Sequence, residues 1–183
     1  METAQHPWLS GLFGDPEIEA ILSPEAELSR MLQIEAAWTR TIAPKADAER
    51  IAAAILAAPI QPQDLKDGTK RDGLPVPDLI RLLKAQLHKE DQPWLHQGLT
   101  SQDVMDTALM ISLQDIMPIL IARLGTLIDA LDALTKRDGE RRLMAVTRMQ
   151  HALPIAVQDK IEACRRPLIT LAKQMPVNEG SPA

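Results

Sequence analysis

Apolar residues recur at helical spacing in the second half of the chain and predict one long helix that begins near Ser101. Its main apolar stripe has steps of three and four residues and consists of Leu109, Leu113, Ile116, Leu120, Leu124, Leu127, Leu131 and Leu134. A second stripe beside it consists of Met110, Met117, Ile121 and Ile128. Because a helix that is apolar on two faces is buried against more than one neighbour, the pattern predicts an elongated helical bundle completed by other subunits.

The register of the main stripe continues past Pro118, so this proline is expected to bend the helix rather than end it. At 1.5 Å per residue the helix would span roughly 50 Å, which is longer than a compact domain of this size needs. An ordered connection at 143–157 is predicted to lead into a last helix near 154–173, and the chain ends in a polar tail at 175–183.

Capping residues mark the helices of the first half. Asp15-Pro16 and Ser23-Pro24 each place a cap residue before a proline, which is tolerated at the first helical position. Further helices are predicted at about 47–57 and 78–89, with an irregular Pro-rich stretch at 59–77 between them. Since no sustained alternation of apolar and polar residues occurs, and Tyr is absent, the sequence predicts an all-α fold.

The composition of the chain argues against several classes of function, including nucleic-acid binding and membrane insertion. The net charge of -5 and the pI of about 5.4 argue against a nucleic-acid-binding surface. The single cysteine, Cys164, excludes an intrachain disulfide and a cysteine-built zinc site. The N-terminus does not resemble a signal peptide, and no uncharged apolar run reaches the roughly 18 to 20 residues of a membrane span. We therefore expect a soluble cytoplasmic protein with no membrane or nucleic-acid partner.

The stretch WLHQGLTSQDVMDT, residues 94–107, carries more polar groups than a helix start requires. In one interpretation Ser101 is an N-cap and Asp103 complements the helix dipole, while Gly98 allows the preceding turn. That interpretation leaves His96 and Thr100 unexplained, together with Gln102, Asp106 and Thr107. In the other interpretation the helix N-terminus, flanked by hydroxyl groups, binds a substrate carboxylate.

Two further polar clusters permit both a functional and an ordinary interpretation. TRMQHALP, residues 147–154, is either a surface loop or a site where Arg148, Gln150 and His151 bind a carboxylate or transfer a proton. GTKRDG, residues 68–73, reads by itself as a charged turn. His6, His88 and Cys164 are expected to be ordinary surface or helical residues. No HxxxH or ExxH spacing occurs, so no metal site is predicted.

Taken in order, the three clusters resemble conserved segments of the fumarase/adenylosuccinate lyase superfamily. HQGLTSQDVMDTAL is similar to its H-x-G-x-T-S-x-D-x-x-D-T segment, TRMQHALP to its second segment, and GTKRDG stands where its first is found. Within the superfamily, TSQDVMDT with QHALP and the stretches LSGLFGD and RDGLPVPDLIRLL resemble the bacterial 3-carboxy-cis,cis-muconate cycloisomerases. The resemblance covers roughly residues 7–173.

The resemblance implies an all-α fold of the fumarase/aspartase type, with an N-terminal helical domain at 1–98 and part of the central bundle at 99–183. Members of this superfamily are homotetramers whose active sites combine segments of different subunits. The implied reaction interconverts 3-carboxy-cis,cis-muconate and carboxymuconolactone in protocatechuate degradation. A carboxylate adds intramolecularly to a double bond, so the reaction requires anion binding and proton transfer but no cofactor. The implied ligand is a small polycarboxylate.

The resemblance also implies roles for individual residues. His96 and His151 are the implied catalytic candidates, and the implied substrate-binding residues are Arg71, Thr100, Ser101, Gln102, Arg148 and Gln150. Arg148 stands where fumarases and adenylosuccinate lyases have a histidine. Because arginine cannot serve as a general base at ordinary pH, it would bind a carboxylate instead. Arg71 likewise replaces a histidine of many lyases.

The sequence departs from the superfamily pattern in two places. Ala145-Val146 replaces a common Gly-Arg pair, and the flexible G-S-S-x-M-P-x-K-x-N-P loop with its catalytic serine and lysine has no counterpart. The sequence is therefore expected to correspond to the N-terminal portion of such an enzyme, truncated, split or working with a second polypeptide. Alternatives are a non-catalytic helical oligomerisation remnant of the fold and another lyase of the superfamily.

Overall fold

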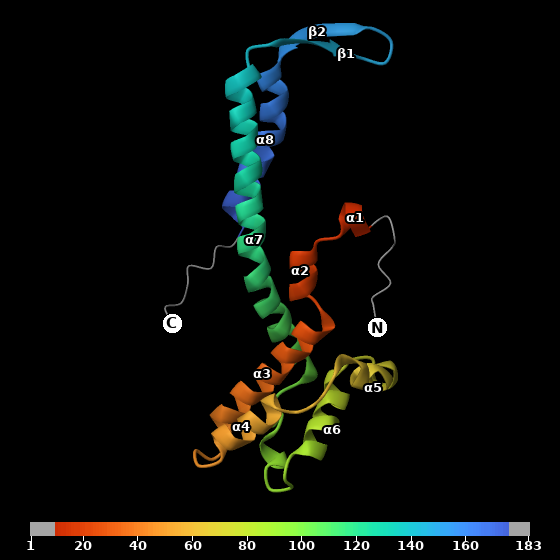
Figure 1. Cartoon of the computed structure of the whole chain (residues 1–183), viewed down its shortest axis with the longest axis vertical. Coiled ribbons are helices and arrows are strands. Elements are labelled where there is room, and N and C mark those ends of the chain that lie inside the picture. Colours follow the sequence, from red (N-terminus) through yellow and green to blue (C-terminus); the bar gives the residue numbers. More distant parts are fainter. Residues whose placement is uncertain (1–9, 176–183) are drawn as a thin grey trace. The chain divides into compact units, whose positions relative to one another are not determined.

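The structure of the chain, a computed structural model, describes residues 10–175 (Figure 1). His6 and the predicted tail beyond Met175 lie outside the described residues. The chain divides into two compact units, Met1–Leu113 and Gln114–Ala183, and the division falls inside helix α7 (Ser101–Asp138). The domain boundary predicted at 98/99 stays a prediction.

The first unit begins with α1 (Ser10–Phe13), α2 (Pro16–Ile21) and α3 (Pro24–Ile42). The predicted caps are confirmed. The side chain of Asp15 accepts a hydrogen bond from the backbone N–H of Ile18 at 3.3 Å, and that of Ser23 accepts one from Ala26 at 3.2 Å. Because each cap residue precedes a proline, the missing proline N–H costs no helical hydrogen bond.

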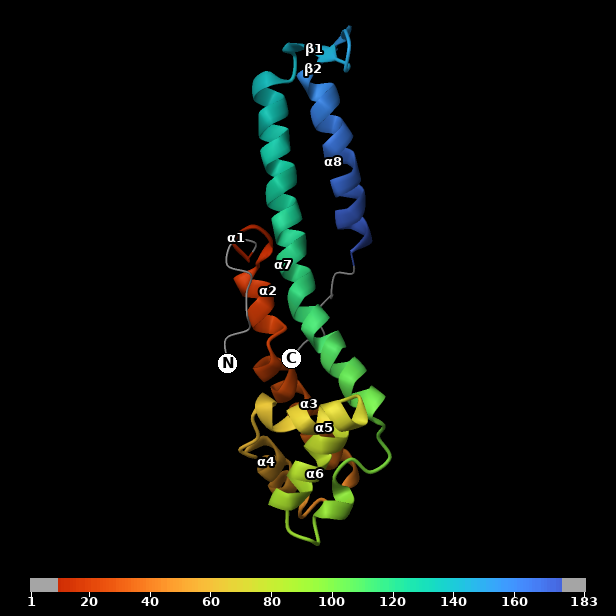
Figure 2. The same cartoon turned by 90° about the vertical axis from the view of Figure 1, so that its right-hand side faces the viewer.

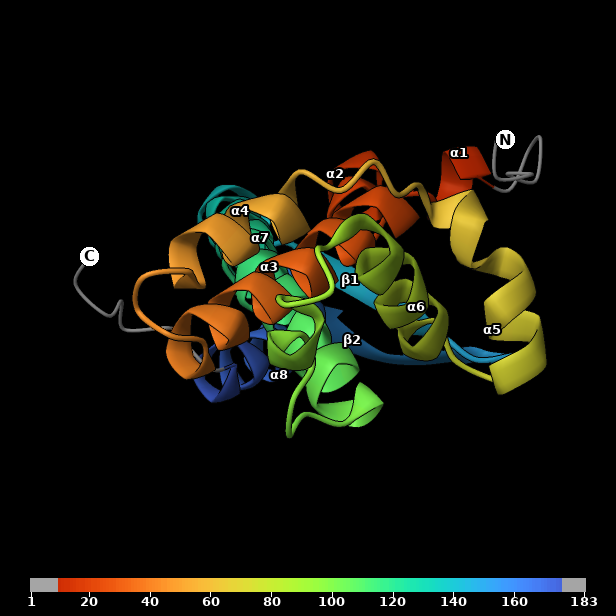
Figure 3. The same cartoon turned by 90° about the horizontal axis from the view of Figure 1, so that it is seen from below.

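The core of this unit lies between α3 and the helices α4 (Ala48–Leu56) and α6 (Val76–Gln86). α4 and α6 confirm the helices predicted at about 47–57 and 78–89. α3 and α4 pack side by side (Figures 1 and 3). The buried apolar side chains include Leu28, Met31, Leu32, Ala36, Ile51, Ala52, Ile55, Leu65, Val76, Leu79, Leu83, Leu95 and Val104.

An ion pair connects α4 to the loop that follows α6. Arg50 donates from Nη1 to Asp91 Oδ2 at 2.6 Å and from Nη2 to Asp91 Oδ1 at 2.8 Å. Asp91 is buried, and its hydrogen bonds with Arg50 hold the pKa of its carboxyl below the usual value. The chain is thus fixed just before the 3-10 helix η2 (Gln92–Trp94).

The prediction that residues 59–77 are irregular is wrong in its central part. This stretch contains the 3-10 helix η1 (Pro62–Leu65) and helix α5 (Lys66–Asp72), so the predicted charged turn at 68–73 is mostly helical. Asp64 Oδ2 accepts a hydrogen bond from the N–H of Gln61 at 2.8 Å, which supports the helix start. Gly73 ends α5 in the left-handed conformation with φ of 80°.

The second unit holds the rest of α7 and a returning helix, α8 (Val157–Gln174). α7 continues through Pro118, as predicted, because the surrounding turns retain their helical geometry. α8 runs back beside the C-terminal half of α7 (Figures 1 and 2). Arg165 on α8 donates from Nη2 to Asp132 Oδ2 on α7 at 3.2 Å and joins the two helices.

Strands β1 (Arg142–Val146) and β2 (His151–Ala156) form an antiparallel hairpin between these helices. The sequence showed no alternation here because both strands are largely exposed and need no apolar face. The prediction that a helix opens at Pro154 is wrong, since Pro154 pairs with Met144 in the hairpin. The helix starts at Val157, where the side chain of Asp159 accepts a hydrogen bond from the N–H of Ala156 at 2.9 Å.

α7 is long and apolar enough to cross a membrane when only length and composition are considered. A core helix of a helical bundle passes the same test. Charged residues at Asp115, Arg123 and Asp129 interrupt its apolar stretches. Several large apolar side chains of α7 are exposed to solvent, namely Leu109, Met110, Leu113 and Leu127.

The exposed apolar side chains of α7 predict that the purified chain associates with other copies, since such a surface favours burial. Analytical ultracentrifugation is expected to show species larger than the monomer. Replacing Leu109 and Leu113 by lysine should shift the distribution toward the monomer, because two charges would have to be desolvated on association. A monodisperse wild-type monomer would contradict this prediction.

Candidate active site

His96 lies in a strained turn between η2 and α7. Its backbone has φ of 59°, a left-handed conformation that costs free energy for a residue other than glycine, and Gly98 follows with φ of 80°. The imidazole Nδ1 lies 2.6 Å from Oε1 of Glu35, whose side chain is fully buried in α3. His96 is therefore held by its side chain in a turn that its backbone alone would not favour.

Two further side chains of α3 hold the same turn. Trp38 donates from Nε1 to the carbonyl oxygen of Gln97 at 2.8 Å, and Thr39 donates from Oγ1 to the carbonyl oxygen of Trp94 at 3.3 Å. Because residues 35, 38 and 39 lie on one face of the helix, all three contacts arise from a single helical surface. The position of the turn thus depends on α3.

The start of α7 is capped by Thr100, so the expectation that Ser101 is the N-cap is wrong. Thr100 donates from its N–H and from Oγ1 to Asp103 Oδ2 at 2.7 and 2.8 Å. The N–H of Asp103 donates in return to Thr100 Oγ1 at 3.2 Å. These reciprocal hydrogen bonds satisfy backbone N–H groups that otherwise have no partner at the start of a helix. Ser101 is then the first helical residue.

Asp103 is held in its ionised form by this cap. The backbone N–H of Thr100, and then its hydroxyl, lower the pKa of the Asp103 carboxyl. Gln102 donates to Asp106 at 2.5 Å along the exposed side of the helix. The Thr100 hydroxyl is thus already engaged in the cap of α7.

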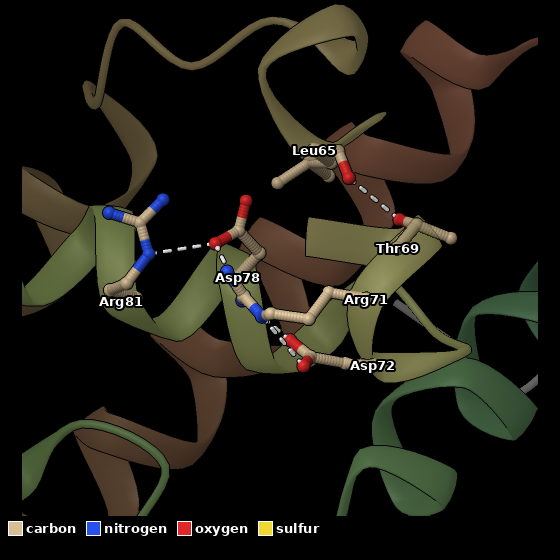
Figure 4. Close-up of polar contacts among 6 residues, drawn as sticks. All are labelled: Leu65, Thr69, Arg71, Asp72, Asp78 and Arg81. Atoms are coloured by element: carbon tan, nitrogen blue, oxygen red, sulfur yellow. Dashed lines mark hydrogen bonds and ion pairs between the residues drawn. The ribbon is translucent and has the colours of Figure 1, made fainter. Parts of the chain in front are cut away.

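Arg71 lies in a separate ionic cluster formed by α5 and α6 (Figure 4). It donates to Asp72 from Nε at 2.9 Å and from Nη2 at 2.7 Å, and its Nη2 lies 3.5 Å from Oδ1 of the buried Asp78. Arg81 donates from Nε to the same Asp78 oxygen at 2.7 Å. A substrate carboxylate bound by Arg71 would therefore compete with Asp72.

Gly68 permits this cluster to form. A Cβ at position 68 would lie 2.1 Å from Cγ of Asp78, so α5 approaches α6 only because residue 68 has no side chain. The hydrogen bond from Arg81, followed by the charges of Arg81 and Arg71, holds the pKa of Asp78 below its usual value despite burial. GTKRDG is thus a packing motif as well as a charged one.

Arg148, Gln150 and His151 lie in the second unit, at the turn of the hairpin. The carbonyl oxygen of Gln150 accepts hydrogen bonds from the N–H and the hydroxyl of Thr147, at 2.9 and 3.0 Å, which close the turn. All three candidate side chains are exposed. The structure therefore brings them together on one turn, and it gathers His96, Thr100, Ser101 and Gln102 at another in the first unit.

An open groove of about 570 Å³ lies between α3 and the first turns of α7. Its walls include Trp38, Leu99, Asp103, Thr107 and Ile111, and none of its lining residues is cationic. Such a surface suits the apolar part of a ligand better than a carboxylate.

The contacts of Glu35, Asp78 and Arg81 were not predicted from the sequence, although a signal was present for Glu35 and Asp78. Glu35 occupies a position on the apolar face of α3, since it follows Met31 and Leu32 at helical spacing. A charged residue at such a position indicates a buried partner. Asp78 similarly precedes the buried pair Leu79 and Ile80.

Residues 30–174 match the model of a protein family described as lyase. Because the match spans most of the chain, the protein belongs to this lyase family, and the resemblance carried by the three polar clusters is confirmed. The all-α fold of the fumarase/aspartase type is confirmed as well. A solved structure described as fumarate lyase from Mesorhizobium sp. BNC1 superimposes on 88% of the chain with a TM-score of 0.76 and 27% identity, covering 39% of that protein.

The relatives act on different substrates. The 3-carboxy-cis,cis-muconate cycloisomerase of Bradyrhizobium diazoefficiens is 32% identical over 85% of this chain and 36% of its own length. An adenylosuccinate lyase of Methanothermobacter thermautotrophicus is 29% identical over 78% of this chain and 33% of its own. The structure of the 3-carboxy-cis,cis-muconate lactonizing enzyme from Pseudomonas putida has a TM-score of 0.81 and 26% identity, covering 92% of this chain and 40% of that one. The chain thus spans two fifths or less of these proteins.

Replacing Thr100 by alanine removes the hydroxyl of the α7 cap and should lower the free energy of unfolding by about 1 kcal/mol. Urea unfolding followed by tryptophan fluorescence measures this change, since the tryptophans are residues 8, 38 and 94. Thr107→Ala is the matched control, because Thr107 is exposed within the same helix, and its effect should stay within about 0.5 kcal/mol. Equal effects of the two substitutions would contradict the assigned cap.

Proposed function

We propose that this chain forms the N-terminal part of a cycloisomerase that interconverts 3-carboxy-cis,cis-muconate and carboxymuconolactone in protocatechuate degradation. The 32% identity with the Bradyrhizobium diazoefficiens cycloisomerase over 85% of the chain carries the proposal. The fold likeness to the Pseudomonas putida lactonizing enzyme supports it.

The proposed reaction requires carboxylate binding and proton transfer without a cofactor. Ser101 at the N-terminus of α7 is suited to one substrate carboxylate, because helical N–H groups and the helix dipole favour an anion there. Thr100 and Gln102 flank this position, and we assign Arg71, Arg148 and Gln150 to the other polar ends of the substrate. His96 and His151 are the proposed proton-transfer groups.

Another lyase activity of the family is the second candidate, because an adenylosuccinate lyase is 29% identical to the chain. Arg148 favours the cycloisomerase. It stands where the resemblance places a histidine in adenylosuccinate lyases, and a guanidinium binds carboxylates but does not act as a general base. A non-catalytic oligomerisation protein with this fold is the third candidate.

We further propose that the whole protein acts in the cytoplasm as a homotetramer that completes each site with segments of several subunits. Two observations support this proposal. The candidate residues lie in three separate parts of the chain, on α5, around the start of α7 and at the turn of the hairpin. α7 also exposes apolar side chains that a bundle of subunits would cover.

The test is turnover of 3-carboxy-cis,cis-muconate, followed by the loss of its diene absorbance. The chain is assayed alone and after mixing with the C-terminal remainder of the Bradyrhizobium diazoefficiens relative. Turnover in the mixture is expected, and Ser101→Ala should reduce it roughly 10- to 100-fold, as for the loss of a hydrogen bond to a charged group.

Ser29→Ala is the control, because Ser29 is an exposed serine on α3 and its substitution should leave turnover unchanged. Turnover of adenylosuccinate instead of the muconate would favour the second candidate. Absence of turnover with both substrates in the mixture would favour the non-catalytic alternative.

A further inference from the structure

The contact between His96 and Glu35 determines which imidazole nitrogen faces a ligand. Nδ1 lies 2.6 Å from Glu35 Oε1, whereas Glu35 itself is fully buried. A carboxylate only accepts hydrogen bonds, and a neutral imidazole carries its proton on one nitrogen. If Glu35 is ionised, Nδ1 must carry that proton, and Nε2 is left with its lone pair.

Glu35 is an unusual residue for the core of this unit. Its neighbours on the same face of α3 are Met31, Leu32 and Ala36, all buried. Its second oxygen, Oε2, is buried and has no hydrogen-bond partner among the described residues. A buried polar atom without a partner costs free energy, so the carboxylate lowers the stability that an apolar residue could provide there.

Anchoring of the turn does not by itself explain Glu35. Trp38 and Thr39 already hold Gln97 and Trp94 through hydrogen bonds to their carbonyl oxygens. Those bonds fix the backbone and leave the ring orientation of His96 open. Within the described residues the imidazole has a hydrogen bond to Glu35, and this contact involves one nitrogen, Nδ1.

We propose that Glu35 is a positioning residue that fixes neutral His96 as the Nδ1–H tautomer with Nε2 as a hydrogen-bond acceptor. This proposal deepens the proposed function and rests on it only for the identity of the ligand. The ligand group that faces His96 is then a hydrogen-bond donor, such as a hydroxyl or a carboxylic acid. A carboxylate would be repelled by the Nε2 lone pair, so carboxylate binding belongs to the start of α7 rather than to His96.

The test is a long-range ¹H–¹⁵N correlation spectrum of the full chain labelled at histidine, recorded without substrate at a pH where imidazoles are neutral. The His96 signals are assigned with a His96→Gln variant. The expected spectrum shows a protonated Nδ1 and an unprotonated Nε2. A protonated Nε2 would overturn the proposal, because Nδ1 of a neutral imidazole would then accept a hydrogen bond from a protonated Glu35.

Three variants separate positioning from structural support. In Glu35→Gln the amide can either accept from or donate to Nδ1, and in Glu35→Leu Nδ1 has no partner, so both should lose the exclusive Nδ1–H form. Thr39→Val is the matched control, since it removes another bond between α3 and the turn and should retain that form. The far-ultraviolet circular dichroism spectrum checks that each variant is folded.

An unchanged tautomer in both Glu35 variants would overturn the role of Glu35. If Glu35→Leu does not fold, the nearly isosteric Glu35→Gln and the wild-type spectrum still decide the question. Because no substrate is used, the result is independent of the turnover assay. A failed assay with the expected tautomer would reject the cycloisomerase and leave the positioning role in place.

Discussion

The candidate site of the first unit depends on the attachment of the 94–97 turn to one face of α3. Glu35, Trp38 and Thr39 each bind a different residue of this turn, and His96 keeps a left-handed backbone as a result. A turn of this kind is not stable by itself, because non-glycine residues disfavour positive φ. Three contacts from α3 hold the turn in this conformation. Because the turn leads directly into α7, they also fix the position where α7 starts.

The order of Thr100, Ser101 and Asp103 determines which polar groups at the start of α7 are already hydrogen-bonded. Thr100 and Asp103 satisfy each other in the cap, which leaves Ser101 as the first helical residue beside the free N–H groups of the helix start. The polar excess of residues 94–107 therefore has three uses. Thr100 and Asp103 cap the helix, His96 is held by Glu35, and Ser101 is the residue that we propose for ligand binding.

Local signals in the sequence were sufficient for much of the fold. The caps at Asp15 and Ser23 and the continuation of α7 past Pro118 follow from neighbouring residues, and the structure confirms them. The hairpin could not be predicted in this way, because exposed strands carry no alternation and Pro154 suggested a helix start. α5 was missed because its seven residues are shorter than the window in which periodicity can be recognised.

The candidate site was predictable only in part, for a related reason. The family resemblance suggested His96, Thr100 and Ser101 as candidates, and their roles stay a prediction. These three residues are close in sequence. Glu35 is 61 residues from His96, and a single sequence gives no measure of such a contact. The cap was assigned to Ser101 rather than Thr100 because both hydroxyls suit an N-cap, and only the bonds to Asp103 distinguish them.

Hydrogen–deuterium exchange tests most directly whether α3 holds the turn and the start of α7. The wild-type chain is compared with the double variant Glu35→Leu/Thr39→Val, and exchange is followed by mass spectrometry. Exchange should accelerate in residues 94–104, while peptides from α4 and α6 should keep their protection, because the hydrogen bonds removed are those to the 94–97 turn. Unchanged protection of residues 94–104, or equal loss throughout the first unit, would contradict the account.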